Sequence, residues 1–345
     1  MNKSTLKIAV VGATGNVGRV MLNILAERGF NAANVYAVAS ENSKGKKISF
    51  GDDSVLTVEG LNDFDFSTVD VGLFSPGSKI SAEFATKAAK AGCVVIDNTS
   101  YFRTDPKVPL IIPEVNPEDI LDCKNKNIIA NPNCAIAPIA IALKPLHDVN
   151  PVKRVIVSTY QSVSGAGKAA MEELDQQTRS LFTGTPKPSE KLPRPIAYNL
   201  IPHIDNFLES GYTGEENKMR DELKKILDST IELSATCVRV PVFVGHCSSV
   251  HVEFEKPFLV ADALEILQNA PGIQVMDADD PLDYATPLDA AGQDDVFISR
   301  LRQDVSHKNG LVFWTASDNL RKGAALNAVQ ILELWLEYKN KKKVA

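Results

Sequence analysis

The chain has 345 residues, a length that fits two domains of ordinary size better than a single core. Hydrophobic residues make up 44% of it and charged residues 23%, which is typical of a globular protein and excludes a disordered or fibrous chain. The net charge of −6 argues against a nucleic-acid partner, because binding to a phosphate backbone requires a basic excess.

Signals for a membrane or for secretion are missing from the sequence. No apolar run approaches the roughly 20 residues that span a bilayer, and residues 1–15 pass into a strand and a turn without a signal-peptide pattern. The five cysteines form no C-x-x-C pair and no zinc-type spacing. We therefore expect a cytoplasmic protein with reduced thiols, no bound metal and no membrane partner.

The first half of the chain alternates strand and helix patterns. Apolar runs at 6–12, 35–40, 70–77 and 94–98 predict buried strands, and helical periodicity follows the first run and recurs at 80–93. Alternation of this kind predicts a Rossmann-like, doubly wound parallel sheet.

The second half follows a different pattern. Long strand patterns recur at 152–163, 236–245, 249–257, 296–302 and 311–317. We expect these strands to form a mostly antiparallel sheet in an α+β domain. The chain then ends in an apolar helical stripe, which predicts a core-packing helix.

A glycine-rich turn, GATGNVG (12–18), follows the first predicted strand and opens a helix. Glycines let the backbone approach a pyrophosphate, and the N–H groups at the helix start favour its charge. The spacing is G-x-x-G-x-x-G rather than G-x-G-x-x-G, so a purely structural turn is the alternative. The position between strand and helix favours a dinucleotide site at Gly12, Thr14, Gly15, Asn16 and Val17.

The second predicted strand ends in ASENSKG (39–45), where an adenosine ribose would lie. An acidic residue such as Glu41 can bond a 2′-hydroxyl, whereas small polar residues with a cation such as Lys44 suit a 2′-phosphate. The local chemistry leaves the choice between NAD and NADP open.

Cys134 stands in NPNCAIAP (131–138), where a strand gives way to an apolar helix. The start of a helix stabilises a thiolate, which is the reactive form of cysteine. Burial as a small hydrophobic residue is the commoner fate of a cysteine, but the flanking Asn and Pro are poor core material. We therefore expect Cys134 to be a nucleophile and the other cysteines to be structural: Cys93, Cys123, Cys237 and Cys247.

A cysteine nucleophile needs a partner for its proton, and His246 is the strongest candidate. It follows a strand that carries Arg239, and in a regular strand the two side chains would lie on opposite faces. Pro241 and Gly245 would allow a bulge or an early end to that strand. On chemistry alone, His246 is equally compatible with a structural role.

Other polar segments offer ligand contacts. The Ser/Gly loop that contains Ser164 and Gly165 ends a strand, and Gln161 before it can hold a carbonyl without carrying charge. Glu215 and Lys218 share one helix face, where a surface ion pair is the plain alternative. Arg103 taken alone is an ordinary loop cation, and Asn319 stands just before the last helix.

Together these segments resemble the aspartate-semialdehyde dehydrogenase family over nearly the whole chain. The resemblance rests on eight segments in the same order: GATGNVG (12–18), VVIDNTSYFR (94–103), VPLIIPEVN (108–116), NPNC (131–134), TYQSVSGAG (159–167), EENKM (215–219), RVPVFVGH (239–246) and DNLRKGAALN (318–327).

The resemblance implies a role for each matching site residue. Cys134 would be the acyl-thioester nucleophile, His246 its acid/base partner and Gln161 the residue that orients the substrate. Arg239 would hold the α-carboxylate, and Glu215 would lie near the substrate amine. The remaining matches comprise Arg103 and Lys218 at the phosphate, Asn133 at the substrate, and Ser40, Asn42, Ser43, Ser164, Gly165 and Asn319 at the cofactor.

The family's reaction is the reduction of L-aspartyl-4-phosphate to L-aspartate 4-semialdehyde with release of phosphate, in the biosynthesis of lysine, threonine and methionine. The implied cofactor is NADP, with NAD not excluded, because many members show A-S-x-R-S where this chain has Ser40-Glu41-Asn42-Ser43. A second departure is Phe74-Ser75-Pro76-Gly77-Ser78, where an alanine-glycine-glycine run is common.

The resemblance also implies the domain organisation and the assembly. A dinucleotide-binding domain would comprise residues 1–133 and 320–345, and a catalytic and dimerisation domain residues 134–319, in a homodimer. The enzymatic alternative is an N-acetyl-γ-glutamyl-phosphate reductase, which lacks a free substrate amine for Glu215 to recognise. A non-catalytic dinucleotide-binding protein is the alternative from another class.

Overall fold

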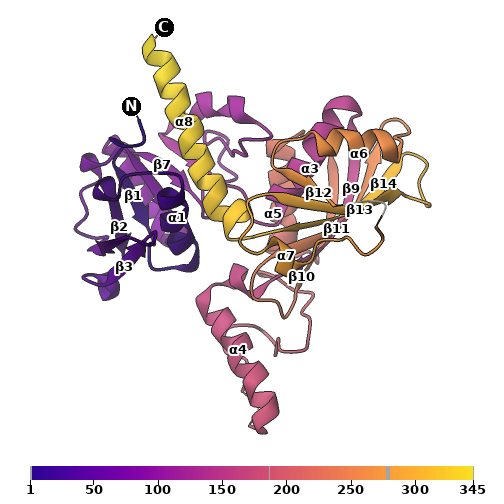
Figure 1. Cartoon of the computed structure of the whole chain (residues 1–345), viewed down its shortest axis with the longest axis horizontal. Helices are drawn as coiled ribbons and strands as arrows, with labels where there is room; N and C mark the ends of the chain where they lie inside the picture. The colour runs from indigo at the N-terminus through magenta and orange to yellow at the C-terminus, as the bar shows by residue number, and fades with distance from the viewer. Residues whose placement is uncertain (1, 186, 277–279, 345) are drawn as a thin grey trace. The chain divides into compact units, whose positions relative to one another are not determined.

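The computed structural model describes residues 2–185, 187–276 and 280–344, which divide into two compact units (Figure 1). One unit joins Met1–Pro132 with Ala324–Ala345, and the other is Asn133–Gly323.

The first unit is built on a six-stranded sheet in the order β5-β2-β1-β6-β7-β8, in which every pair of neighbours is parallel. Its central strands are buried apolar runs, because a parallel sheet is covered on both of its faces. The predicted doubly wound sheet is confirmed. Its strands are β1 (Ile8–Val11), β2 (Val35–Ala39), β5 (Glu59–Gly60), β6 (Val71–Phe74), β7 (Val94–Asp97) and β8 (Ile128–Ala130), beside a hairpin of β3 (Lys47–Phe50) and β4 (Ser54–Thr57).

Three long helices accompany this sheet: α1 (Asn16–Glu27), α2 (Ser78–Lys90) and α8 (Leu326–Val344). α1 and α8 contact each other, and their apolar residues join the strands in one hydrophobic core. The C-terminal stripe is therefore core-packing, as predicted, and Figure 1 shows α8 as a single long helix. Short 3-10 segments complete the unit: η1 (Ala32–Asn34), η2 (Glu41–Ser43), η3 (Phe66–Thr68) and η4 (Pro117–Asn125).

The second unit contains a six-stranded sheet in the order β10-β9-β11-β14-β13-β12. Its three inner pairings are antiparallel and the two outer pairings are parallel, so the prediction of a mostly antiparallel sheet is confirmed. The strands are β9 (Val152–Gln161), β10 (Glu232–Arg239), β11 (His246–Phe254), β12 (Ile273–Val275), β13 (Val296–Gln303) and β14 (Gly310–Ser317).

One predicted strand has different ends in the structure. The run at 236–245 leaves the sheet after Arg239, and the next strand begins at His246 rather than at 249. Pro241 has no N–H to donate to the sheet, and Gly245 adopts a positive φ of 96°, which strand residues do not.

Helices of the second unit pack against its sheet. The apolar helix after Cys134 is α3 (Ile136–Val149), which begins two residues later than that cysteine and packs on β9, β11, β13 and β14. The longest helix of this unit, α4 (Lys168–Thr183), extends away from the sheet (Figure 1). The other elements are α5 (Gly214–Ile226), α6 (Val260–Gln268), α7 (Pro287–Ala290), the 3-10 segment η5 (Val163–Ala166) and the π-helix η6 (Arg321–Ala325).

Candidate active site

Three of the predicted residues lie side by side at one end of the sheet in the second unit. Gln161 on β9 pairs with Arg239 on parallel β10 and with His246 on antiparallel β11. Residues that are paired across neighbouring strands project from the same face of a sheet. Arg239 and His246 therefore share a face, with Gln161 between them.

The early end of β10 makes this alignment possible. After Arg239 the chain leaves the sheet, and Gly245 turns it back into β11. A Cβ atom on Gly245 would lie 2.7 Å from the carbonyl oxygen of Pro287, so only glycine fits this return. The two strands then present Arg239 and His246 at the same level.

Cys134 faces this row from the turn that precedes α3. Its Sγ lies 3.4 Å from Nε2 of His246, a sulfur hydrogen-bond distance. Asn133 fixes the turn, because its Oδ1 accepts the N–H of Ala135 at 2.7 Å. Gly323 lies behind the cysteine, where a Cβ atom would be 2.9 Å from Cys134 Cβ. The predicted nucleophile and its partner are thus in contact.

His246 is almost completely buried and is held on both ring nitrogens. Its Nδ1 accepts a hydrogen bond from the main-chain N–H of Ser162 at 3.1 Å, and Ser162 Oγ lies at the same distance. Burial and then the positive charge of Arg239 lower the pKa of His246 to about 3, against an opposing effect of the Gly245 main chain. The imidazole is therefore neutral at physiological pH.

Asn319 organises the surroundings of His246. Its Oδ1 accepts from the N–H of Gly245 at 2.9 Å and from the hydroxyls of Ser162 and Ser164 at 3.1 and 3.2 Å. Its Nδ2 donates to Ser164 Oγ at 2.9 Å. Ser164 and Asn319, which we predicted at the cofactor, thus belong to one buried network with the histidine.

Gly165, also predicted at the cofactor, lies against the same row. A Cβ atom there would be 3.0 Å from a guanidinium nitrogen of Arg239 and 3.2 Å from Nε2 of His246. Glycine at this position therefore lets the loop pack closely on both groups.

Helix α5 holds the cysteine turn through carboxylates. Oε1 of the buried Glu215 accepts from Asn133 Nδ2 at 2.8 Å and from Gln161 Nε2 at 3.2 Å. Oε2 of Glu222, which is 2% exposed, accepts the N–H of Asn133 at 2.6 Å. Glu222 was not predicted from the sequence. Its position seven residues after Glu215 on the same helix was the available signal.

The cations predicted at the substrate have definite partners. Arg239 donates to the carbonyl oxygen of Ser162 at 2.7 Å. Lys218 pairs with Asp205 at 2.6 Å and with Glu215 at 3.4 Å. Arg103 belongs to the first unit, where it donates to the carbonyl oxygen of Asn131 at 2.9 Å, three residues before Cys134 in the chain.

The remaining cysteines differ from Cys134 in burial. Cys93, Cys123, Cys237 and Cys247 are buried, whereas Cys134 is partly exposed. Burial raises the pKa of Cys93, Cys237 and Cys247 to about 12. Those three thiols are protonated at neutral pH.

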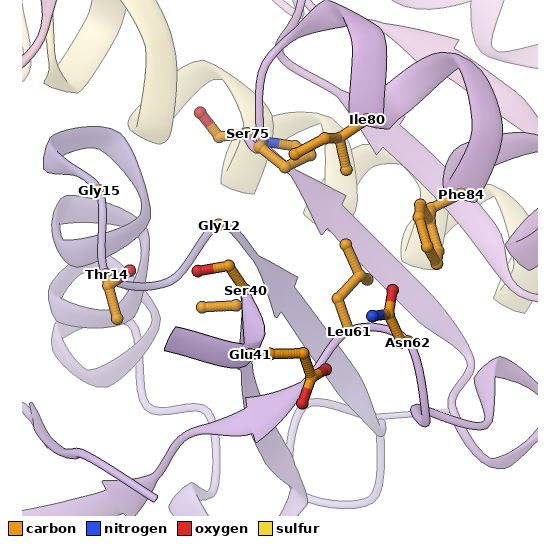
Figure 2. A pocket seen from close by; sticks show the side chains of 12 residues that line it. Gly12, Thr14, Gly15, Ser40, Glu41, Leu61, Asn62, Ser75, Ile80 and Phe84 are labelled. Carbon is orange, nitrogen blue, oxygen red and sulfur yellow. The ribbon is translucent and has the colours of Figure 1, made fainter. Parts of the chain in front are cut away.

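A cavity of about 460 Å³ opens at the glycine-rich turn of the first unit. The turn lies on one side of it, and Ile80 and Phe84 lie on the opposite side (Figure 2). The lining residues are Gly12, Thr14, Gly15, Ala39, Ser40, Glu41, Leu61, Asn62, Ser75, Pro76, Ile80 and Phe84.

The glycine turn has the close packing that a dinucleotide site requires. A Cβ atom on Gly12, whose φ is 86°, would lie 2.6 Å from the carbonyl oxygen of Ser75. A Cβ atom on Gly18 would lie 2.2 Å from the Gly12 carbonyl, so the start of α1 packs directly on the turn. Asn16 and Val17 form the first residues of α1, where N–H groups face outward along the helix axis.

Only some residues of the segment that we predicted at the ribose line the cavity. Ser40 and Glu41 line the cavity, whereas Asn42 is exposed and Ser43 is buried outside it. Lys44 lies 2.8 Å from Asp63 and 3.7 Å from Glu41. Among the described lining residues there is a carboxylate but no lysine or arginine. Four lining residues were not predicted from the sequence: Leu61, Asn62, Ile80 and Phe84.

A parallel-sheet unit with this glycine turn, joined to a unit in which a cysteine meets a histidine, defines a nicotinamide-dependent oxidoreductase. Family models agree: residues 7–123 match the NAD binding domain of semialdehyde dehydrogenases, and residues 143–322 match their dimerisation domain.

Individual relatives point to one family within this class of oxidoreductase. The chain is 50% identical to the aspartate-semialdehyde dehydrogenase of Rickettsia typhi over 326 residues, 94% of this chain and 96% of the relative. It is similar to the crystal structure of aspartate semialdehyde dehydrogenase II from Vibrio cholerae in complex with ASA, with a TM-score of 0.93, 46% identity and coverage of 96% and 98%. The Candida albicans enzyme, solved with NADP, has a TM-score of 0.73, 25% identity and coverage of 97% and 99%.

The chain belongs to the aspartate-semialdehyde dehydrogenase family. It is an oxidoreductase of amino-acid biosynthesis that acts on an aldehyde group, as the resemblance implied.

Within the part of the chain that the structure describes, no helix is both long and apolar enough to cross a membrane. Across the same residues, no group of three or more His, Cys, Asp and Glu side chains is arranged to hold a metal ion.

Proposed function

We propose that this chain reduces L-aspartyl-4-phosphate to L-aspartate 4-semialdehyde and releases phosphate, with Cys134 as the nucleophile and His246 as its acid/base partner. The contact of 3.4 Å between Cys134 Sγ and His246 Nε2 carries the proposal. A purely structural cysteine would not need a buried imidazole beside it in a turn that three polar side chains hold in place.

The steps follow from the chemistry of the thiolate. The sulfur of Cys134 attacks the acyl carbon, a C–S bond forms, and the C–O bond to phosphate breaks to leave a thioester. A nicotinamide cofactor, when bound, would supply the hydride that this carbon needs. The resulting thiohemiacetal oxyanion collapses, the C–S bond breaks, and the aldehyde leaves with the thiolate restored. One proton is consumed overall, by the departing phosphate.

Substrate recognition uses two sets of charges. Arg239 would hold the α-carboxylate, since its buried guanidinium lies near His246 and a guanidinium stays protonated in proteins. Glu215 would accept the substrate amine, and Gln161 and Asn133, both bonded to that carboxylate, would orient the substrate. Arg103 and Lys218 would bind the phosphate group.

We further propose that the chain uses NADP and accepts NAD as well, because the described lining of the cavity carries Glu41 and no lysine or arginine. The glycine turn would hold the pyrophosphate at Gly12, Thr14, Gly15, Asn16 and Val17, since a side chain at the first position would collide with Ser75. Leu61, Ile80 and Phe84 offer apolar surfaces for the adenine ring. Ser40, which lines the cavity, and the exposed Asn42 would serve the ribose, and Ser164, Gly165 and Asn319 the nicotinamide.

The oligomeric state, the domain boundaries and the cellular location of the protein are also proposals. A homodimer formed through the second unit is supported by the match of residues 143–322 to a dimerisation domain. We assign residues 1–133 and 320–345 to the nucleotide domain, residues 134–319 to the catalytic and dimerisation domain, and the whole protein to the cytoplasm.

The test is phosphate-dependent reduction of NADP or NAD by the purified protein with L-aspartate semialdehyde. Wild type should turn over and Cys134→Ala should not, while N-acetyl-glutamate semialdehyde should be a poor substrate for both. Activity with the acetylated substrate alone would assign the chain to N-acetyl-γ-glutamyl-phosphate reduction. Cofactor binding without turnover of either substrate would indicate a non-catalytic protein.

A further inference from the structure

Lys218, the cation that we assign to the phosphate group, lies between two carboxylates. Its Nζ is 2.6 Å from Oδ2 of Asp205 and 3.4 Å from Oε2 of Glu215, so the contact with Asp205 is the tighter one. Glu215 and Lys218 both belong to α5, and their i, i+3 spacing alone would favour a close ion pair. Asp205 comes from outside that helix. Competition between the two carboxylates therefore sets the position of the ammonium group.

The main chain at Asp205 directs its carboxylate toward the first turn of α5. Asp205 has a φ of 68°, in the left-handed region that most side chains avoid and that Asp tolerates. Its Oδ1 accepts the N–H of Asn206 at 2.8 Å, and its Oδ2 faces Lys218. A Cβ atom on Gly214, the first residue of α5, would lie 2.7 Å from that Oδ2. The glycine therefore leaves the space in which the carboxylate lies.

The segment 201–214, which carries Asp205, is fixed at both ends to elements of the candidate active site. At its start, Ile201 exchanges two main-chain hydrogen bonds with Arg239, at 2.9 and 2.8 Å. Near its end, Thr213 is the N-cap of α5 and closes a capping box there. The segment thus joins the end of β10 to the helix that carries the lysine.

We propose that Asp205 is a positioning residue that holds the Lys218 ammonium group away from Glu215, so that Lys218 remains available to phosphate and Glu215 to the substrate amine. This inference rests on the proposed function and adds to it a residue that acts through Lys218. Without the Asp205 carboxylate, Lys218 would close on Glu215, and the two groups would neutralise each other. The binding of both substrates would then weaken.

The hydrogen bonds of Glu215 indicate what a closer ion pair would disturb. Its Oε1 accepts from Asn133 Nδ2 at 2.8 Å and from Gln161 Nε2 at 3.2 Å, whereas its Oε2 contacts Lys218. A shorter bond from Lys218 would occupy Oε2 with the protein's own cation. A substrate ammonium would then have to displace that cation before it could bind the carboxylate.

The Asp205 carboxylate carries the charge that this role requires. Burial acts to raise its pKa, but hydrogen bonds from Lys218 and from the N–H of Asn206 outweigh that effect and lower the pKa below its usual value. The side chains of Lys218 and Asp205 are 30% and 33% exposed, so the pair is reached from solvent. An ion pair exposed to this extent contributes little to folding, and its loss should leave the fold intact.

Asp205→Asn tests the charge, because Asn has nearly the same size and tolerates the same left-handed backbone. In the phosphate-dependent oxidation of L-aspartate semialdehyde, we expect the KM for phosphate and the KM for the aldehyde each to rise about fivefold or more. We expect kcat to stay within about threefold of wild type, because saturating substrates displace the internal pair. An unchanged or lowered KM for phosphate would overturn the proposal, since a carboxylate that merely repelled phosphate would give the lowered value.

The backbone of Asp205 can be separated from its charge by a second variant. Asp205→Gly removes the carboxylate and adopts the left-handed conformation without strain. We expect it to raise both KM values at least as much as Asp205→Asn does, while urea denaturation shows both variants to be as stable as wild type within error. Wild-type KM values in Asp205→Gly would overturn the proposal, because the residue would then matter only through its backbone.

A double variant tests whether Lys218 closes on Glu215. Glu215→Gln removes the second anion, so in the Asp205→Asn protein it should lower the KM for phosphate back toward that of wild type. The KM for the aldehyde should stay high, because the carboxylate assigned to the substrate amine is gone. No recovery for phosphate would overturn the proposal. A wild-type protein without phosphate-dependent turnover would refute the proposed function itself, whereas wild-type turnover with unchanged KM values in the Asp205 variants would refute this inference alone.

Discussion

Gly323 lies directly against Cys134: a Cβ atom built on the glycine would be 2.9 Å from Cys134 Cβ and 3.2 Å from its Cα and its carbonyl oxygen. Glycine occupies a π-helical turn here, where helix propensity alone would favour alanine. The close approach therefore explains the glycine, and it fixes how far the cysteine turn can recede from His246.

The first prediction concerns this contact. Gly323→Ala must displace Cys134 toward or away from His246, because the contacted atoms are largely main chain. We expect a loss of about 100-fold in kcat, from misplacement by an ångström or less, and a loss of stability of about 1–3 kcal/mol. Steady-state kinetics and urea denaturation measure the two effects. Wild-type kcat in a folded Gly323→Ala protein would show that the turn yields freely.

The second prediction concerns Glu222, whose carboxylate accepts the N–H of Asn133 at 2.6 Å. Glu222→Ala leaves that buried donor unpaired and should cost about 1–3 kcal/mol of stability together with activity. Glu222→Gln keeps an acceptor oxygen and should recover much of both. If the two variants behave alike in urea denaturation, the carboxylate does not hold the turn through this bond.

The third prediction concerns thiol reactivity. Iodoacetamide at neutral pH should modify Cys134 first, because burial raises the pKa of Cys93, Cys237 and Cys247 to about 12. Peptide mapping by mass spectrometry after short exposure gives the order. Addition of denaturant is the control, since all five cysteines should then react. Early modification of any of those three buried residues in folded protein would contradict their assignment as structural.

Some features of the site could be predicted from the sequence, and others depend on how distant segments pack together. The glycine turn and the pair Cys134 and His246 were predictable, because each occupies a segment with its own sequence pattern. Whether Arg239 and His246 share a face depended on where β10 ends, which Pro241 and Gly245 left open in the sequence. The pairing of both strands with β9 decides it.

Contacts between residues that are distant in the sequence also could not be predicted from local sequence patterns. The walls of the nucleotide cavity at Leu61, Ile80 and Phe84 come from segments that carry no motif, and folding alone brings them opposite the glycine turn. Glu222 reads as an ordinary helix charge until its bond to Asn133 is seen. The outer strand pairs of the second sheet are parallel, which alternation of apolar residues cannot reveal.

The fourth prediction concerns acid stability. The pKa of His246 falls from 6.5 to about 3 in the folded protein, so between these values the unfolded chain binds one proton more than the folded chain. The free energy of unfolding is therefore unaffected by His246 above pH 6.5 and decreases as the pH falls below that value, by roughly 1.4 kcal/mol per pH unit at most. His246→Gln lacks this contribution. The difference between the urea-denaturation free energies of the two proteins should therefore change with pH below 6.5 and stay constant above it.

The last prediction concerns cofactor choice. Asn42 is exposed at the ribose end of the nucleotide cavity, where Glu41 is a lining residue and Lys44 is paired with Asp63. A 2′-phosphate bound there would meet a carboxylate and, among the described lining residues, no cation, so wild type should discriminate only weakly between NADP and NAD. Asn42→Arg adds a guanidinium that can bind the phosphate by charge-assisted hydrogen bonds. The ratio of kcat/KM for NADP to that for NAD should then rise about tenfold or more. Asn42→Gln, equally polar but uncharged, is the matched control and should leave the ratio near that of wild type. A strong wild-type preference for NADP that Asn42→Arg does not increase would mean that another residue supplies the charge.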